Sequence, residues 1–182
     1  FTIENIQTLK NAGLYRPGVH IPRHAGEGVQ HNNFIVLLED AAPVAVWTGS
    51  ATISAGSLFG QASMGHVVWD PALARSYLEY WERLATNLPP EQLREENRAA
   101  TPLPDGAPPE NSVTSLFCPR DESDGTPTLA WYAARMEEAD LLLCLSVGAR
   151  LDDAFLPAIA ADREALRYII RDDELEHGEL VH

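Results

Sequence analysis

Lysine is almost absent from this 182-residue sequence, in which Lys10 is the only one. Acidic residues outnumber basic ones by 27 to 13, and the formal net charge at pH 7 is −14. A surface with this charge repels phosphate backbones and anionic lipid head groups on average. The composition therefore disfavours general nucleic-acid binding, although a local arginine pocket can still bind one phosphate.

Long apolar runs are also missing, since none approaches the ~20 residues of a membrane span. We therefore expect no transmembrane segment and a cytoplasmic location. Only two cysteines occur, Cys118 and Cys144, each within an apolar stretch, which favours buried free thiols over a disulfide framework. The sequence begins at Phe1 without a basic-then-apolar leader, and we expect a fragment or a processed form.

The spacing of apolar and turn residues predicts the elements of the first half of the chain. We expect a helix over residues 2–12, buried strands at 34–38 and 44–48, a loop-like segment at 54–65 and a short strand at 67–69. Asp70-Pro71 then begins a helix that runs to Ala85, with Asp as the N-cap. Residues 87–111 are rich in Pro, Glu, Asp and Asn, which predicts a linker or a long surface loop.

Strands and helices alternate in the second half. The pattern predicts a strand at 113–118, a helix beginning at Thr126-Pro127, a strand at 141–147, a short helix near 153–165 and a strand at 166–170. This alternation is typical of an α/β fold with a largely parallel or mixed sheet.

The pattern most suggestive of chemistry lies in residues 29–54, "VQHNNFIVLLEDAAPVAVWTGSATIS". Together with "GHVVWDPALARSYLEYWERL", this stretch resembles the histidine–lysine motif region of the phospholipase D superfamily. The motif of that family is His-x-Lys, followed after four residues by Asp in many members, and further on by Gly-Ser and then x-Asn. The resemblance covers residues 1–88 well, and "SLFCPR" with the residues after it resembles the opening of a second lobe more weakly.

The motif is matched at three positions and altered at the others. His31 stands at the motif histidine, and Gly49 and Ser50 stand at the Gly-Ser. Asn33 occupies the lysine position, Leu38 the aspartate position and Thr52 the asparagine position.

The resemblance implies an α/β fold with a phospholipase D-like mixed sheet flanked by helices. Residues 1–88 would be the C-terminal part of a first lobe, 89–112 a linker, and 113–182 the start of a second lobe. The implied activity is that of a phosphodiesterase or phosphatidyltransferase-type hydrolase, in which one histidine attacks phosphorus to form a phosphohistidine and a second protonates the leaving alcohol.

The resemblance also implies roles for particular residues. His31 and Ser50 would be catalytic, and Asn33, Gly49 and Thr52 would bind the substrate, which can be a phospholipid, a nucleic acid or a small diester. No cofactor is implied. A zinc site at His20, His24 and His31 is not expected, because Pro22 prevents the helix that would bring the first two together.

The altered positions weaken the expected electrostatics. An asparagine at position 33 has no charge, which should cost ~2–4 kcal/mol of transition-state stabilisation, or two to three decades in rate. Arg23 and Arg120 are candidates for the missing cation, the alternative being that both are surface charges. A second function therefore stays open, that of a catalytically inactive lobe with a structural or partner-binding role.

A second His-x-Lys does not occur after Gly49, and His177 and His182 in "LEHGELVH" lack the required spacing. Two explanations remain open. The second motif can lie beyond residue 182 in a longer protein, or two chains can pair across a twofold axis, as single-motif members of the family do.

Overall fold

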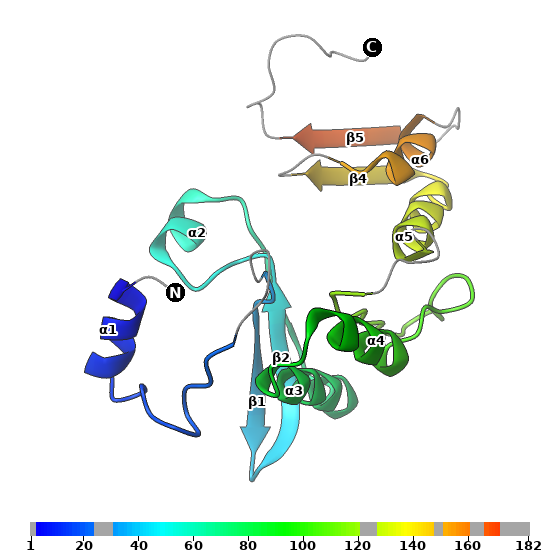
Figure 1. The fold of residues 1–182 in the computed structure, drawn as a ribbon. Helices are drawn as coiled ribbons and strands as arrows, with labels where there is room; N and C mark the ends of the chain where they lie inside the picture. Colours follow the sequence, from blue (N-terminus) through cyan, green and yellow to red (C-terminus); the bar gives the residue numbers. More distant parts are fainter. Residues whose placement is uncertain (1–2, 24–30, 121–126, 148–150, 161–165, 172–182) are drawn as a thin grey trace. The chain divides into compact units, whose positions relative to one another are not determined.

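The chain has a mixed α/β fold in a computed structural model that describes residues 3–23, 31–120, 127–147, 151–160 and 166–171 (Figure 1). It divides into two compact units. Unit 1 comprises Phe1–Pro102 with Val113–Asp121, and unit 2 comprises Leu103–Ser112 with Glu122–His182. Among the described helices, none is both long and apolar enough to cross a membrane.

Unit 1 contains a three-stranded antiparallel sheet in the order β1-β2-β3, formed by β1 (Phe34–Glu39), β2 (Ala42–Gly49) and β3 (Gly65–Val68). The predicted strands in these three places are confirmed. Asp40 and Ala41 join β1 to β2 and have φ angles of +47° and +65°. Positive φ at both central residues is the conformation of a type I′ turn, which is one of the two favoured turns for a two-residue hairpin loop.

The prediction that both hairpin strands are buried is correct for β2 alone. Ala45 and Val46 of β2 are buried, whereas Ile35 and Leu37 of β1 are 50% and 43% exposed. The reason is that β1 is an edge strand, while β2 is central and α3 (Pro71–Ala85) packs mainly against β2.

Helix α3 begins as its sequence predicts. The Asp70 carboxylate accepts hydrogen bonds from the backbone N–H groups of Ala72 and Leu73, and Pro71 occupies the first turn. The helix crosses the sheet (Figure 1) and presents Tyr77 and Tyr80 to Phe34, with ring-centre distances of 5.3 and 5.6 Å. These rings form part of the core of unit 1.

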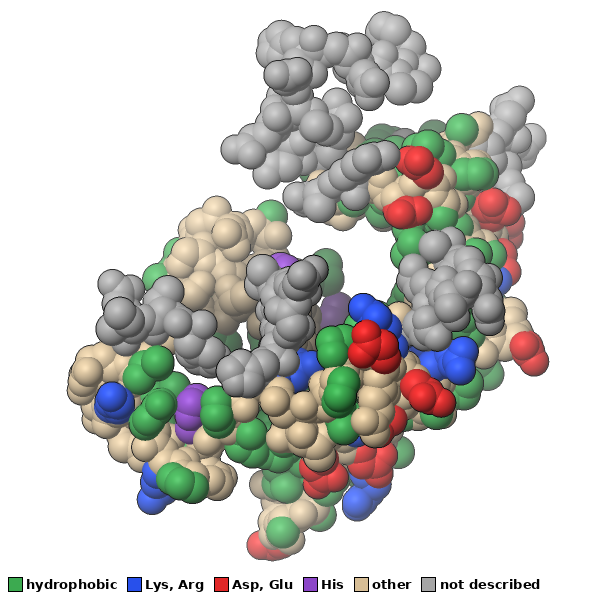
Figure 2. Space-filling model, viewed as in Figure 1, with side chains coloured by type: hydrophobic (Ala, Val, Ile, Leu, Met, Phe, Trp, Pro, Cys, Tyr) green, Lys and Arg blue, Asp and Glu red, His purple; other side chains and the backbone are tan. Residues whose placement is uncertain are grey.

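A second helix, α4 (Pro90–Ala100), occupies most of the segment that we expected to be a linker. Its Pro90 suits the first turn of a helix. Leu93 and Asn97, four residues apart, are almost fully buried on one face, while Glu91, Gln92, Glu95 and Arg98 are exposed. Figure 2 shows such acidic side chains on the α3 and α4 side of unit 1 and none over α2 (Ala55–Gly60). The charges that suggested a linker cover the outer face of an amphipathic helix.

The segment at 113–118 is not the strand that was expected to begin a second lobe. It is irregular and belongs to unit 1, where the Phe117 ring stacks on Tyr80 at 4.4 Å between ring centres. The Asn97 amide donates to the Pro119 carbonyl (3.0 Å), and the Arg120 guanidinium donates to the Thr101 carbonyl (2.8 Å). The two units are therefore divided differently from the lobes that the sequence suggested.

Of two short helices in unit 1, α1 was predicted from the sequence and α2 was not. Helix α1 (Ile3–Asn11) matches the expected helix over residues 2–12. Helix α2 lies where a loop was expected, and its first turn is capped by the Ser54 hydroxyl, which accepts a hydrogen bond from the Ser57 N–H (3.2 Å).

Unit 2 contains the expected alternation of helices and strands. It comprises α5 (Pro127–Glu137), β4 (Leu142–Val147), a 3₁₀ turn (Asp153–Phe155), α6 (Leu156–Ala160) and β5 (Leu166–Arg171). Strands β4 and β5 are parallel, so the chain as described holds one antiparallel and one parallel sheet. Residues 161–165 of the predicted helix lie outside the described residues.

The prediction that both cysteines are buried is wrong, because both side chains are exposed. Cys144 lies on the exposed side of β4, where exposed and half-buried residues alternate. Cys118 belongs to the irregular segment that borders α3 and α4.

We predict that Asn97→Ala destabilises unit 1 by about 2 kcal/mol, because it leaves the Pro119 carbonyl without its amide donor and removes the acceptor of Arg83 (3.4 Å). Urea unfolding of the full chain, followed by near-ultraviolet circular dichroism, measures this change. The control is Arg98→Ala, an exposed neighbour on α4 that should change the free energy of unfolding by less than about 0.5 kcal/mol. Equal effects of the two substitutions would contradict the assignment.

Candidate functional site

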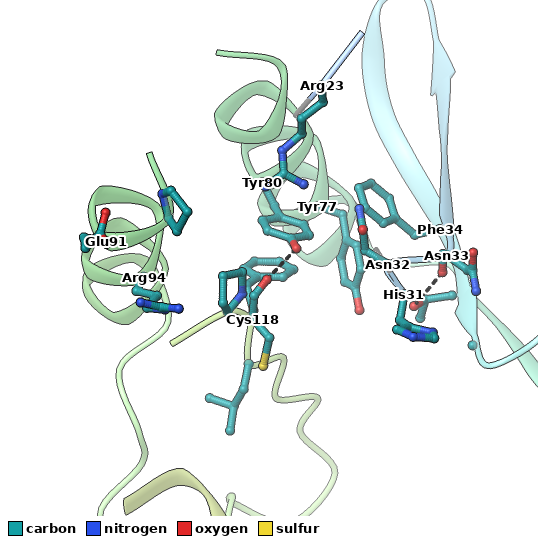
Figure 3. A pocket seen from close by; sticks show the side chains of 16 residues that line it. Arg23, His31, Asn32, Asn33, Phe34, Tyr77, Tyr80, Glu91, Arg94 and Cys118 are labelled. Carbon is teal, nitrogen blue, oxygen red and sulfur yellow. Dashed lines mark hydrogen bonds between the residues drawn. The ribbon is translucent and has the colours of Figure 1, made fainter. Parts of the chain in front are cut away.

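A pocket with a volume of about 680 Å³ lies within unit 1 (Figure 3). Its walls come from Arg23 and the residues before β1, the end of β2, α3, the first turns of α4 and the segment 116–119. The volume is within the range of pockets that hold small molecules, and it is much larger than one phosphate group.

Three of the five predicted site residues line this pocket: His31, Asn33 and Gly49. The His31 side chain is exposed, so a ligand in the pocket can reach its ring. Asn33 is half-buried, and its backbone carbonyl accepts a hydrogen bond from the Thr48 hydroxyl (3.4 Å), which ties the residues before β1 to the end of β2 (Figure 3).

Gly49 is required by the backbone of the sheet itself. A Cβ atom at this position would collide with the Met64 carbonyl oxygen and would lie 2.7 Å from the Cα of Gly65. Any side chain would therefore push β2 away from β3. The packing of β2 against β3 therefore requires the motif glycine, independently of any contact with a ligand.

Ser50 and Thr52 are not among the residues that line the pocket. The Ser50 hydroxyl accepts a hydrogen bond from the Met64 N–H (3.1 Å), and the Ser50 N–H donates to the Met64 carbonyl (3.0 Å). The Thr52 N–H donates to the Ser57 hydroxyl (2.9 Å) at the start of α2. Both residues lie in the connection after β2, where these contacts hold the chain.

Aromatic rings form the inner wall of the pocket. Tyr77 and Tyr80 of α3 lie between Phe34 and Phe117, and the Tyr80 hydroxyl donates to the Cys118 carbonyl (2.7 Å; Figure 3). Burial raises the pKa of the Tyr80 hydroxyl above its ordinary value of 10.0, and the positive charge of Arg23 opposes this shift in part. Tyr80 therefore stays neutral and donates its hydrogen bond at physiological pH.

The two arginines named as candidates for the missing cation lie in different surroundings. Arg23 lines the pocket and lies near enough to Tyr80 to influence its charge. Arg120 does not line it; the Arg120 side chain is buried, and its guanidinium donates to the Thr101 carbonyl and hydroxyl (2.8 and 3.0 Å). Its role is to hold the segment 116–120 on α4, so Arg120 is not the missing cation, and for Arg23 the suggestion stays a prediction.

A third arginine, Arg94, was missed at the sequence level. It lines the pocket from α4 together with Glu91, which precedes it by one turn of the helix. Figure 3 shows Arg23 and Arg94 on different sides of Tyr80, with His31 at the opposite wall beside β1 and β2. The periodicity of Leu93 and Asn97 is the signal that could have placed Arg94 on a helix.

Metal ligands do not gather in the part of the chain that the structure describes, where no group of three His, Cys, Asp or Glu side chains is arranged to hold an ion. His24 lies outside the described residues, so the set His20, His24 and His31 is not fully described.

Comparison with known proteins adds no relative: no family model, curated protein or solved structure matches the chain.

We predict that the contribution of Tyr80 to stability is lost at alkaline pH. The unfolded chain releases the Tyr80 proton near pH 10, whereas the folded chain, in which the pKa is raised, retains it. The free energy of unfolding therefore falls as the pH rises from 10 through the raised pKa.

The test compares wild type with Tyr80→Phe in urea unfolding at pH 8 to 11. The variant should be less stable by about 1 kcal/mol at pH 8, because the Cys118 carbonyl loses its donor, and the difference should shrink as the pH rises above 10. Tyr168→Phe, at a tyrosine that is 58% exposed, is the matched control and should show neither effect. A difference for Tyr80→Phe that is constant with pH would refute the prediction.

Proposed function

We propose that the pocket of unit 1 binds a phosphodiester and that His31 attacks its phosphorus. The observation that supports the proposal most is the convergence of His31, Asn33 and Gly49 on one pocket, since a short sequence pattern alone singles out these three positions. This function is the one that the resemblance to the phospholipase D superfamily implies.

The proposed reaction has two steps. A neutral ring nitrogen of His31 donates its lone pair to phosphorus, a P–N bond forms, and the P–O bond to the leaving group breaks. The leaving alkoxide takes a proton from a general acid, which by the family pattern is a second histidine. Water, whose proton returns to the second histidine, then attacks the phosphohistidine, the P–N bond breaks, and the phosphate monoester leaves with His31 restored.

The pocket contains groups for only some of these steps. Asn33 offers an amide at the position where the family has a lysine, so hydrogen bonding replaces a full charge. The second histidine would come from another lobe, either in a longer chain or in a second copy of this one. We therefore expect slow turnover from this chain alone, especially with substrates whose leaving group needs a proton.

The alternative function is an inactive lobe that acts as a structural or binding partner. The observation in its favour is the uncharged side chain at position 33, which removes the cation of the motif. In that case the pocket would be the remnant of a catalytic site, and restoring the lysine would restore little or nothing.

The experiment that separates the two functions is Asn33→Lys, assayed in the full chain with bis(4-nitrophenyl) phosphate. Nitrophenolate leaves without a proton, so this substrate does not need the second histidine. We predict that kcat/KM increases by about 10²–10³-fold over wild type, because a positioned charge stabilises the phosphoryl transition state.

Two control variants make the result specific. Asn32→Lys adds the same charge to a neighbouring residue that also lines the pocket, and it should increase the rate much less. Adding His31→Ala to Asn33→Lys should abolish the gain. An Asn33→Lys variant no faster than Asn32→Lys, or one that keeps its rate without His31, would exclude the proposed mechanism.

A further inference from the structure

Arg23 and Arg94 differ from the other arginines that the structure shows to be partly or fully buried. Arg83 stacks over the rings of Tyr80 and Phe117 at 5.7 and 5.6 Å. Arg120 is hydrogen-bonded to Thr101, and in unit 2 Arg135 forms a salt bridge with Glu138 (2.6 Å). These three guanidinium groups each have a defined protein partner, although Nη2 of Arg83 and Nε and Nη1 of Arg135 are also buried without an acceptor.

The guanidinium groups of the two pocket arginines have no such partner among the described residues. The Nε of Arg23 is buried without a hydrogen-bond acceptor. Arg94 is half-buried, and within the described ranges it has neither a hydrogen bond nor a carboxylate within 4 Å. What sets Arg23 and Arg94 apart is that both line the pocket and neither has a described protein partner, so a ligand in the pocket can pair with them.

The charges around the pocket are few and mainly positive. No Asp, Glu, Lys or Arg occurs between Ala41 and Trp69, so the strand wall of the pocket carries no formal charge. The charged lining residues are Arg23 and Arg94 with the carboxylate of Glu91. In a chain with a net charge of −14, this pocket is a local site where an anion is attracted rather than repelled.

We infer that Arg23 and Arg94 form an anion-binding subsite apart from Asn33, and that the ligand is a small phosphate compound with at least two negative charges. Guanidinium groups match phosphate oxygens with two parallel hydrogen bonds. The two arginines come from different elements and lie on different sides of Tyr80 (Figure 3), which suits two anionic groups better than one. The choice of phosphate as the anion rests on the proposed function.

Calorimetric titration of the full chain with inorganic phosphate and with pyrophosphate, at constant ionic strength, tests this inference. Wild type should bind pyrophosphate about tenfold more tightly than phosphate. Arg23→Gln and Arg94→Gln should each weaken pyrophosphate binding about tenfold, and Arg94→Lys, which keeps the charge but loses the fork, should lie between Arg94→Gln and wild type.

Arg98→Gln is the matched control, because Arg98 is an exposed arginine one turn further along α4 and does not line the pocket. It should leave pyrophosphate binding unchanged, and urea midpoints confirm that each variant is folded. An equal loss in Arg98→Gln and Arg94→Gln, or unchanged binding in both pocket variants, would overturn the inference.

The two proposals can fail separately. His31→Ala should abolish hydrolysis while retaining pyrophosphate binding within about threefold, since the arginines remain. If both arginine variants bind pyrophosphate as tightly as wild type while His31-dependent hydrolysis persists, the anion subsite alone is refuted. If pyrophosphate binding depends on the arginines but no hydrolysis depends on His31, the proposed reaction alone is refuted.

Discussion

The contact on which the rest of unit 1 depends is the docking of the segment 116–120 against α3 and α4. Phe117 stacks on Tyr80, and the buried Asn97 amide donates to the Pro119 carbonyl. These interactions join the two stretches of sequence that make up unit 1, and stacked aromatic pairs contribute about 0.5–1.5 kcal/mol beyond the area that they bury. Without this segment α4 would lose the partner of its buried face, and the pocket would lose one wall.

The same contact determines the chemistry that the pocket can offer. By holding α4 beside α3, it brings Arg94 to a pocket whose opposite wall contains His31. A histidine that stands alone before a strand has little functional meaning, but His31 shares its pocket with two positively charged side chains, Arg23 and Arg94. Positive charge therefore comes to this pocket from Arg94, which is far from the motif in the sequence, as well as from Arg23.

Local signals predicted the elements that local interactions stabilise. The Asp70-Pro71 start of α3 and the β1–β2 hairpin are correct because a cap and a turn each involve a few neighbouring residues. Helix α4 was missed because its charged outer face resembles a linker. Its buried face can be recognised only from the contact of Asn97 with Pro119, which is 22 residues away. Arg94 could not be assigned to the site for the same reason, whereas His31 and Gly49 could be chosen from a short pattern.

The central claim is that the pocket of unit 1 is a phosphate-binding site. Crystals of the full chain soaked in tungstate, a heavy-atom analogue of phosphate, test it most directly, because anomalous scattering locates the metal oxyanion without any assumption about catalysis. We predict a tungsten peak in the pocket, within hydrogen-bonding distance of Arg23 or Arg94 and facing His31. A well-occupied peak elsewhere on the chain, with this pocket empty, would contradict the claim.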